Sequence, residues 1–279
     1  MYRIEKVLNH NTVIAIHQDD HKEVLIMGKG VGFGRKVAER IEVRPEDRLY
    51  SLQKYKERGG AKEIVKSIAP EFLELTNAVL NEAEKVFGKI DRMVLFPLAD
   101  HIAFAVKRIQ NHEQISNPLT EDIRVLFHME FKVAESIRPL LKKQFQIDIE
   151  DDEIGYVALH IHSAIEDEKV SQAMQMARSV RECISMVEEA IGKPINIASL
   201  SYNRLMNHIR YMVARALSGE KLKVNMNDYM SVRFPKSYAL ATSVCDRLAA
   251  STGLTFDEME IGYLAMHIER VYSTCSPST

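Results

Sequence analysis

The chain is short of the features that mark secreted, membrane-spanning and strongly charged proteins. Its 279 residues include three cysteines, an odd number without CxxC spacing, and no signal-peptide-like apolar stretch, so a reducing cytoplasm is expected. No apolar run approaches the ~20 residues needed to cross a bilayer, which excludes a membrane-spanning role. With 46% hydrophobic and 27% charged residues, the composition is that of a soluble globular protein of two or three domains.

Charge is nearly balanced overall but not along the chain. The formal net charge is −2, whereas residues 1–36 hold six Lys or Arg against four Asp or Glu, which is +2 and leaves −4 for the remainder. This imbalance is by itself a weak indication that the N-terminal segment binds nucleic acid.

Two stretches of the sequence are nearly identical. EIGYVALHI and EIGYLAMHI agree at seven of nine positions, and their histidines, His160 and His267, are 267 − 160 = 107 residues apart. His101 and His208 are separated by 208 − 101 = 107 residues as well. The chain therefore contains an internal duplication. A titratable side chain that is kept twice in each copy indicates a function that uses histidine.

Hydrophobic periodicity predicts sheet first and helices afterwards. Over the first ~40 residues, RIEKVL, TVIAIH and EVLIM alternate apolar and polar side chains, with turn-forming residues between them, which predicts a small antiparallel sheet. The glycine-rich stretch MGKGVGFGRK follows, and it could still be a strand whose backbone is open to close approach by a partner. From about residue 65 the apolar period becomes helical and remains so.

These patterns predict a multi-domain protein, with an N-terminal antiparallel β-sheet domain followed by two homologous all-α helical bundles. The sheet domain is expected to cover residues 1–56, and a linker, 57–66, has two adjacent glycines amid charges. The helical domains would cover residues 67–170 and 171–279.

The duplicated histidines have a structural and a functional interpretation. On a helix, His101 and His160 lie at the flank of an apolar stripe, where a ring can be held by packing and still meet solvent or a partner protein. The structural interpretation is that all four are hydrogen-bonded histidines that cap a core. Two histidines kept in both copies favour a function instead. His112 and His128 have no counterpart in the second copy and are interpreted as surface or structural residues.

A metal site is the competing functional interpretation. His160 and His162 form an HxH pair, and zinc readily takes imidazole, so a duplicated helical metal-dependent hydrolase would be the enzymatic alternative. The second copy has Glu269 in place of His162, however, and no carboxylate or cysteine cluster completes a ligand set. No nucleophile elbow of the Ser-His-Asp or Cys-His kind is recognisable either. The prediction is therefore a protein with no metal and no cofactor.

The order of the motifs resembles the BglG and LicT family of transcriptional antiterminators. The resemblance covers essentially the whole chain and is carried by KVLNHN, by MGKGVGFGRK, by DHIAFAVKR followed by NPL, and by both EIGY helices. It implies an N-terminal RNA-binding domain that works as a dimer and two phosphotransferase-system regulation domains. Members of the family bind a hairpin in nascent mRNA and prevent an overlapping terminator from forming, so that sugar-utilisation genes are transcribed.

The resemblance implies that the sheet domain contacts the hairpin. RNA hairpins are usually recognised at loops and bulges, where bases stack on aromatic rings and expose their edges. Asn9 and Asn11 would contact bases and Phe33 would stack, although Phe33 could instead belong to the sheet core. The family commonly has a third asparagine where this chain has His10. The glycines would let the RNA backbone come close. The lysines and the arginine would bind phosphates, unless they are merely solvated surface residues. The candidate RNA-binding residues are therefore Lys6, Asn9, Asn11, Gly28, Lys29, Gly30, Phe33, Arg35 and Lys36.

The resemblance also implies that the protein is controlled by phosphorylation of histidine. His101 and His160 in the first helical domain, and His208 and His267 in the second, would accept phosphoryl groups from other phosphotransferase-system proteins. Each group adds about −1.5 to −2 charges, enough to repel or reorganise a packed dimer interface. In the family, phosphorylation of the second domain by the phosphocarrier HPr generally favours the active dimer. Modification of the first domain by the sugar-specific enzyme II permease switches it off.

The sequence thus predicts a homodimeric, cytoplasmic antiterminator that is not an enzyme. Its expected partners are an mRNA hairpin, HPr and an enzyme II permease, without DNA and without stable membrane insertion. A DNA-binding activator with the same regulatory domains would need a helix-turn-helix. The N-terminal segment is too short and too strand-like to hold one.

Overall fold

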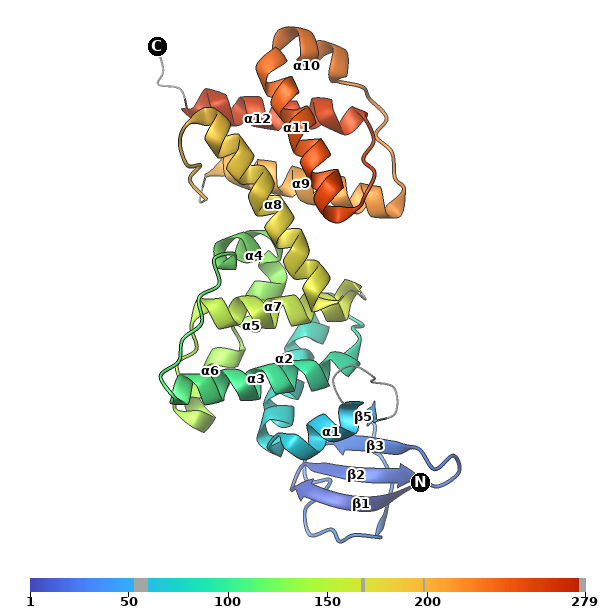
Figure 1. The fold of residues 1–279 in the computed structure, drawn as a ribbon. Coiled ribbons are helices and arrows are strands. Elements are labelled where there is room, and N and C mark those ends of the chain that lie inside the picture. Colours follow the sequence, from blue (N-terminus) through green and yellow to red (C-terminus); the bar gives the residue numbers. More distant parts are fainter. Residues whose placement is uncertain (53–59, 167–168, 198, 276–279) are drawn as a thin grey trace. The chain divides into compact units, whose positions relative to one another are not determined.

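The computed structural model describes residues 1–52, 60–166, 169–197 and 199–275 (Figure 1). An antiparallel sheet at the N-terminus is followed by helices, which confirms the predicted fold class. None of the helices within these ranges combines the length and the apolar character needed to cross a membrane.

The sheet has five antiparallel strands in the order β4-β1-β2-β3-β5. The three strands predicted from alternation are β1, β2 and β3, whereas β4 and β5, of two and four residues, are too short to give a periodic signal. The strands are β1 (Tyr2–Asn9), β2 (Thr12–His17), β3 (Glu23–Met27), β4 (Arg40–Ile41) and β5 (Arg48–Ser51).

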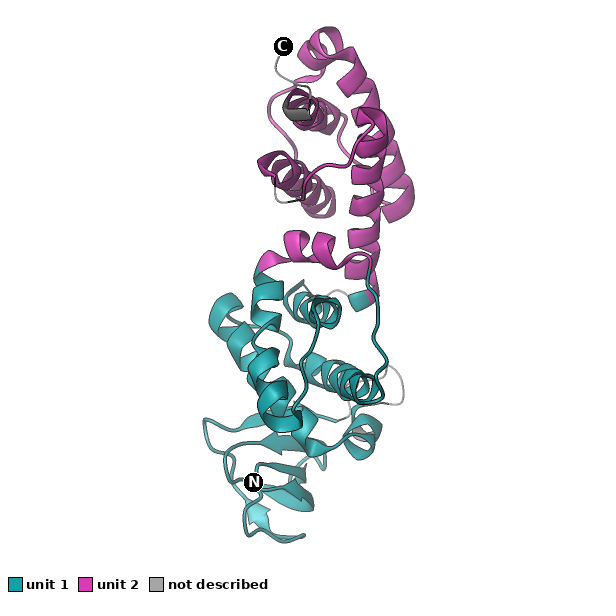
Figure 2. Ribbon diagram, turned by 90° about the vertical axis from the view of Figure 1, so that its left-hand side faces the viewer, with its two compact units in different colours: residues 1–117, 129–170 teal, residues 118–128, 171–279 magenta. Residues whose placement is uncertain are grey.

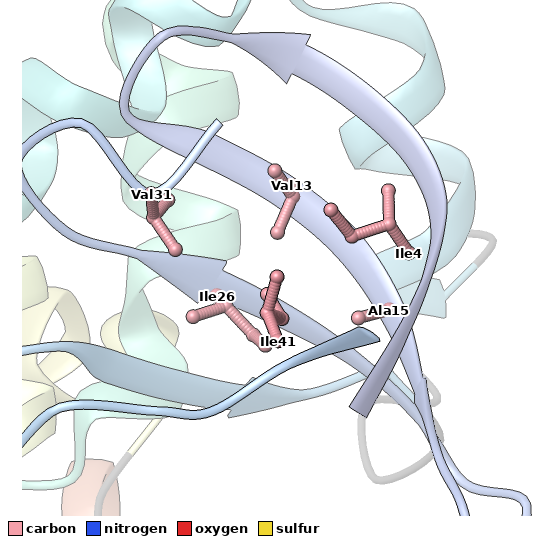
Figure 3. Close-up of a cluster of buried hydrophobic side chains, with 6 residues drawn as sticks. All are labelled: Ile4, Val13, Ala15, Ile26, Val31 and Ile41. Carbon is pink, nitrogen blue, oxygen red and sulfur yellow. The ribbon is translucent and has the colours of Figure 1, made fainter. Parts of the chain in front are cut away.

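One face of the sheet carries its own small core. Ile4 of β1 pairs with Ala15 of β2, and Val13 of β2 pairs with Ile26 of β3, so the period of two places these side chains on the same face (Figure 3). Val31, from the glycine-rich segment, closes over them. Each large apolar side chain buried in this way contributes about 1.5–3 kcal/mol. The cluster consists of Ile4, Val13, Ala15, Ile26, Val31 and Ile41.

The opposite face of the sheet packs against helices. Leu25 pairs with Tyr50 across β3 and β5, and both are fully buried. The Tyr50 ring meets Phe96 edge-on at 6.0 Å, and its hydroxyl donates to Asn77 at 2.7 Å and accepts from Arg92 at 2.8 Å. The sheet is therefore covered on both faces, once by its own loop and once by helices.

The helical part begins at residue 60, so the described part of the predicted linker, residues 60–66, belongs to a helix, and residues 57–59 lie outside the described ranges. The elements are α1 (Gly60–Ser67), α2 (Pro70–Phe87), the 3-10 turn η1 (Arg92–Val94), α3 (Leu95–Gln110), α4 (Thr120–Leu126), α5 (His128–Ala134), α6 (Ile137–Phe145), α7 (Asp151–Glu166), α8 (Val170–Ile191), α9 (Leu200–Ser218), α10 (Asn227–Arg233), α11 (Pro235–Thr252) and α12 (Met259–Cys275).

The chain forms two compact units (Figure 2). Unit 1 holds residues 1–117 and 129–170, and unit 2 holds residues 118–128 and 171–279. Helix α4 thus belongs to unit 2, where Tyr202 of α9 donates a buried 2.6 Å hydrogen bond to Asp122. In each unit two helices bring the duplicated histidines together, α3 with α7 in unit 1 and α9 with α12 in unit 2.

Candidate RNA-binding face and histidine sites

Two loops of the sheet domain are hydrogen-bonded into one surface. The first is the turn between β1 and β2, and the second is the glycine-rich segment after β3, which forms consecutive turns and not a strand. Asn11 joins them, because its carbonyl accepts from the N–H of Gly28 at 2.9 Å and its Oδ1 from that of Gly30 at 2.8 Å. Gly30 has a φ of 71°, which favours glycine.

At two glycines of the glycine-rich segment, other parts of the sheet domain leave no room for a side chain. A Cβ at Gly28 would lie 1.8 Å from Asp47 Oδ1, and one at Gly32 would lie 2.2 Å from the carbonyl oxygen of Asn9. Asp47 is held beside Gly28 by a 2.7 Å hydrogen bond from Arg44. The structure therefore gives Gly28 an internal role, and its predicted contact with RNA stays a prediction.

The predicted stacking residue and the predicted cations are open to solvent. Phe33 is 68% exposed, so it does not belong to the core of the sheet. The ring of His10 stands edge-on to Phe33 with centroids 5.2 Å apart. An exposed aromatic ring among cations can stack on a base while the cations bind phosphates. The predicted cations are all exposed: Lys6, Lys29, Arg35 and Lys36.

The two asparagines are engaged by a carboxylate from the helical part of unit 1. Asn9 Nδ2 donates to Glu74 Oε1 at 2.6 Å, and Asn11 Nδ2 donates to Glu74 Oε2 at 3.3 Å. Asn9 Oδ1 also accepts from the backbone N–H of Asn11 at 2.9 Å. Both amide donors are thus hydrogen-bonded within the chain in this conformation. The sequence holds no local signal for Glu74, because its two partners are more than 60 residues away along the chain.

The first histidine site joins α3 and α7. The rings of His101 and His160 lie 5.4 Å apart between centroids, and the Tyr156 ring lies 5.6 Å from that of His101. His101 Nε2 is 3.3 Å from Glu153 Oε2, and Arg108 donates to the other oxygen of that carboxylate. Both histidines are partly buried, as a flank position predicts.

The second site repeats this arrangement on α9 and α12. The rings of His208 and His267 are stacked at 4.7 Å, and the Tyr263 ring lies 6.3 Å from His208. Here Arg215 holds both oxygens of Glu260, at 2.6 and 2.8 Å, and His208 Nε2 is 3.8 Å from Glu260 Oε2, beyond hydrogen-bond distance.

The two sites share five residues at one spacing. Sequence analysis selected the histidines only, although the 107-residue separation applies equally to the residues around them and could have identified them. The pairs are His101 and His208, Arg108 and Arg215, Glu153 and Glu260, Tyr156 and Tyr263, and His160 and His267.

Burial keeps three histidines of the two sites uncharged. Burial, with the neighbouring His101, lowers the pKa of His160 to about 3. Burial and the adjacent ring lower the pKa of His208 to about 3, and burial with nearby arginines lowers that of His267 to about 4. Neutral imidazole carries a free lone pair, so these rings are in their nucleophilic form at pH 7.

The carboxylate of the first site is held in its charged form. Burial alone would raise the pKa of Glu153, but hydrogen bonds from His101 and Arg108 hold that pKa below its ordinary value. Its first-turn position on α7, beside Asp151 and Asp152, also suits a negative charge at a helix N-terminus. The first site therefore sets a buried carboxylate beside a histidine pair of which His160 is uncharged.

The metal interpretation finds no support in the described residues. Nowhere in these ranges do three His, Cys, Asp or Glu side chains gather in a way that could hold a metal ion. His162, the second member of the HxH pair, has its Nδ1 3.0 Å from Glu130 Oε1. The unmatched His112 and His128 are exposed.

Family comparisons agree with this architecture. The structure sets a sheet domain with an exposed aromatic ring and exposed cations before two histidine-bearing helical parts. The model of the CAT RNA binding domain matches residues 2–59, and that of the PRD domain matches residues 61–164 and 181–271. The chain belongs to the family of antiterminators in which a CAT RNA-binding domain precedes two PRD domains. The resemblance stated from the sequence is confirmed, and this is a family of regulators, not of enzymes.

Individual relatives are similar over nearly the full length. The GlcA/glcB genes antiterminator of Staphylococcus carnosus (strain TM300) is 28% identical over 274 residues, which are 96% of this chain and 94% of the relative. The beta-glucoside operon antiterminator of Dickeya chrysanthemi is 24% identical over 281 residues, 99% of each chain. The crystal structure of GlcT CAT-PRDI matches with a TM-score of 0.52 and 31% identity, and covers 59% of this chain and 98% of that one.

Proposed function

We propose that this chain is a sugar-responsive transcriptional antiterminator. It binds an mRNA hairpin that overlaps a terminator, and phosphorylation of its histidines by the phosphotransferase system controls that binding. The observation that carries the proposal is the repeated five-residue histidine site, which follows an RNA-binding domain in the same chain.

The hairpin would be bound by the joined loops of the sheet domain. Phe33 is available to stack on an unpaired base, and the exposed cations around it can neutralise phosphates. Asn9 and Asn11 can present amides to base edges once they exchange Glu74 for RNA. Since a sheet of about 50 residues buries little surface by itself, dimerisation would stabilise it further, and a dimer would present two copies of this face.

Phosphorylation would act through charge. A phosphoryl group of about −1.5 to −2 charges on His101 or His208 would lie beside a buried glutamate, where Coulomb repulsion is weakly screened. The site cannot keep its present packing with both anions in place. The α3–α7 or α9–α12 pair must therefore rearrange, and the quaternary arrangement of the homodimer would change with it.

The direction of control would differ between the domains. The phosphocarrier HPr would phosphorylate the second PRD and favour the active dimer, and a sugar-specific enzyme II permease would phosphorylate the first PRD and switch the protein off. When sugar is transported the permease passes its phosphoryl groups to sugar, so the first PRD loses them and transcription proceeds.

Transcription in vitro tests this function. The template carries the hairpin and its overlapping terminator, and the protein is added untreated or after incubation with phosphoenolpyruvate, enzyme I and HPr. We expect protein-dependent readthrough that changes after phosphorylation. The matched control replaces His101, His160, His208 and His267 by alanine, and it should not respond. Readthrough equal to that without protein, in both states, would contradict the proposal.

A further inference from the structure

Among the described residues, one ring of each histidine pair lies near a carboxylate and the other does not. His101 Nε2 lies 3.3 Å from Glu153, whereas no described carboxylate lies that close to His160. In the second site Glu260 lies near His208 and not near His267. The same member of the pair, the one on the N-terminal helix, therefore has an anionic neighbour in both domains.

The carboxylate of Glu153 lies next to one particular nitrogen of the His101 ring, Nε2. Nε2 of His101 and Oε2 of Glu153 are both buried, and neither makes a well-aligned hydrogen bond, either with the other or with any further described group. They are 3.3 Å apart, so each is the natural partner of the other. Because Nε2 faces the carboxylate inside the protein, Nδ1 is left as the outward nitrogen. In His160 the reverse holds, since its Nδ1 is the buried atom.

We propose that Glu153 is a positioning residue that holds His101 in the Nε2–H tautomer, so that Nδ1 accepts the phosphoryl group. This inference rests on the proposed function and assigns the acceptor atom at the first site. A carboxylate that accepts from one ring nitrogen fixes the proton there and leaves the lone pair on the other. His101 is thus the prepared nucleophile of the first pair.

The transfer step follows from this arrangement. The Nδ1 lone pair of neutral His101 attacks the phosphorus of a phosphohistidine on the donor protein. The new N–P bond forms as the donor's N–P bond breaks, and that electron pair returns to the donor ring. The Nε2 proton stays in place throughout. Positive charge that develops on the attacking ring is stabilised by Glu153, so the carboxylate acts more strongly in the transition state than before it.

The arginine of each site binds its glutamate differently. Arg108 takes one oxygen of Glu153 and leaves the other for His101, whereas Arg215 takes both oxygens of Glu260. His208 Nε2 is correspondingly farther from its carboxylate, at 3.8 Å. Removal of the glutamate should therefore disturb the ring in the first domain more than in the second.

Imidazole nitrogen shifts measure the tautomer directly. The full-length chain is labelled with ¹⁵N-histidine in a background with His160→Ala, His208→Ala and His267→Ala. The difference from the same background with His101→Ala added isolates the signal of His101. The unphosphorylated protein should show protonated Nε2 and unprotonated Nδ1 at His101. Glu153→Ala should mix the tautomers. Glu153→Gln, whose amide oxygen still accepts, should restore the Nε2–H form.

Phosphorylation then reports the acceptor atom. After incubation with phosphoenolpyruvate, enzyme I, HPr and the sugar-specific enzyme II permease, the ³¹P and ¹⁵N signals should identify phosphate on Nδ1 of His101. Glu153→Ala should slow its formation about 10- to 100-fold, the range that orienting partners of histidines show elsewhere, and should yield some Nε2 isomer.

The results of these two measurements test the role of Glu153 separately from the proposed function. A Glu153→Ala chain that keeps a pure Nε2–H tautomer, or a wild-type chain phosphorylated only on Nε2 of His101, would overturn the inference. The tautomer is measured without phosphorylation, so it decides the role of Glu153 even if no phosphohistidine forms, a result that would instead count against the proposed function. If Glu153→Ala fails to fold, the rate of phosphorylation of Glu153→Gln is compared with that of the wild type. We expect a smaller loss of rate than for Glu153→Ala, and phosphate still on Nδ1 of His101.

Discussion

The candidate RNA-binding face and the histidine sites place their polar groups in opposite ways. The face is built on turns, and Phe33 with its neighbouring cations lies in solvent. The histidines lie on helices, and burial holds the pKa of three of them at about 3 to 4. A surface that binds a polyanion needs exposed positive charge, whereas a histidine nucleophile that must stay neutral is favoured by burial.

This difference predicts how substitutions behave in the two regions. Side chains on the face can be changed with little effect on folding, because they bury little surface. Side chains in the histidine sites are packed between two helices, so changes there affect stability and control together.

Removal of both histidines of the first site should abolish sugar control. With His101→Ala and His160→Ala no phosphoryl group can enter the first PRD, so readthrough of a reporter should no longer need inducer. His128→Ala, an exposed histidine of the same domain, is the matched control and should keep inducer dependence. If the double variant still requires inducer, the first PRD is not the negative switch.

Removal of the exposed ring should weaken RNA binding without unfolding the chain. Stacking of a base on an aromatic ring is worth about 1–3 kcal/mol, so Phe33→Ala should raise the Kd for the hairpin about 5- to 150-fold. Val37→Ala, also on the exposed surface of the sheet domain at 63%, serves as the control. An unchanged Kd with an unchanged circular dichroism spectrum would remove Phe33 from the site.

The buried histidines should make stability fall on acidification. The pKa of His160 is about 3 in the folded chain against an ordinary 6.5, so the unfolded state binds more protons between these values. Stability is retained above pH 6.5 and is lost as pH falls toward 3, by at most about 1.4 kcal/mol per pH unit for this residue. Urea unfolding at pH 7, 6 and 5 should show a smaller loss for His160→Asn. The exposed His128→Asn should show the wild-type loss, and identical slopes for all three chains would refute the assignment.

Release of the asparagines should strengthen RNA binding modestly. Glu74 accepts from both Asn9 and Asn11 and places a negative charge at the face. Glu74→Ala should therefore lower the Kd of the full chain for the hairpin several-fold, consistent with about 1 kcal/mol for hydrogen bonds that RNA must displace. Glu71→Ala removes an exposed charge from the same helix and should have less effect. Weaker binding by Glu74→Ala would mean that Glu74 supports the face and does not compete for it.

The sequence predicts the secondary structure and the duplication of this molecule better than its tertiary contacts. Alternation over residues 2–27 predicts three strands correctly, because each strand repeats its pattern over five to eight residues. Strand β4, with two residues, has no period to detect. The helical domains follow from periodicity, and the duplication follows from the EIGY stretches.

The candidate sites divide in the same way. The histidines stand out because they repeat at one spacing, and Glu153 with Arg108 could have been found by the same rule. Nothing local links Glu74 to Asn9, since the two are brought together only by packing of the sheet on α2. Nor could the pattern show that Gly28 faces Asp47, a contact between residues of different turns.

Binding of the full-length chain to the terminator-overlapping hairpin is the most direct test of the central claim. A gel shift over a salt series compares the hairpin with a scrambled hairpin of the same composition. The account predicts binding to the hairpin that is tighter than to the scrambled control and that weakens steadily as salt rises. Equal affinity for both RNAs, or no binding by a folded dimer at low salt, would contradict it.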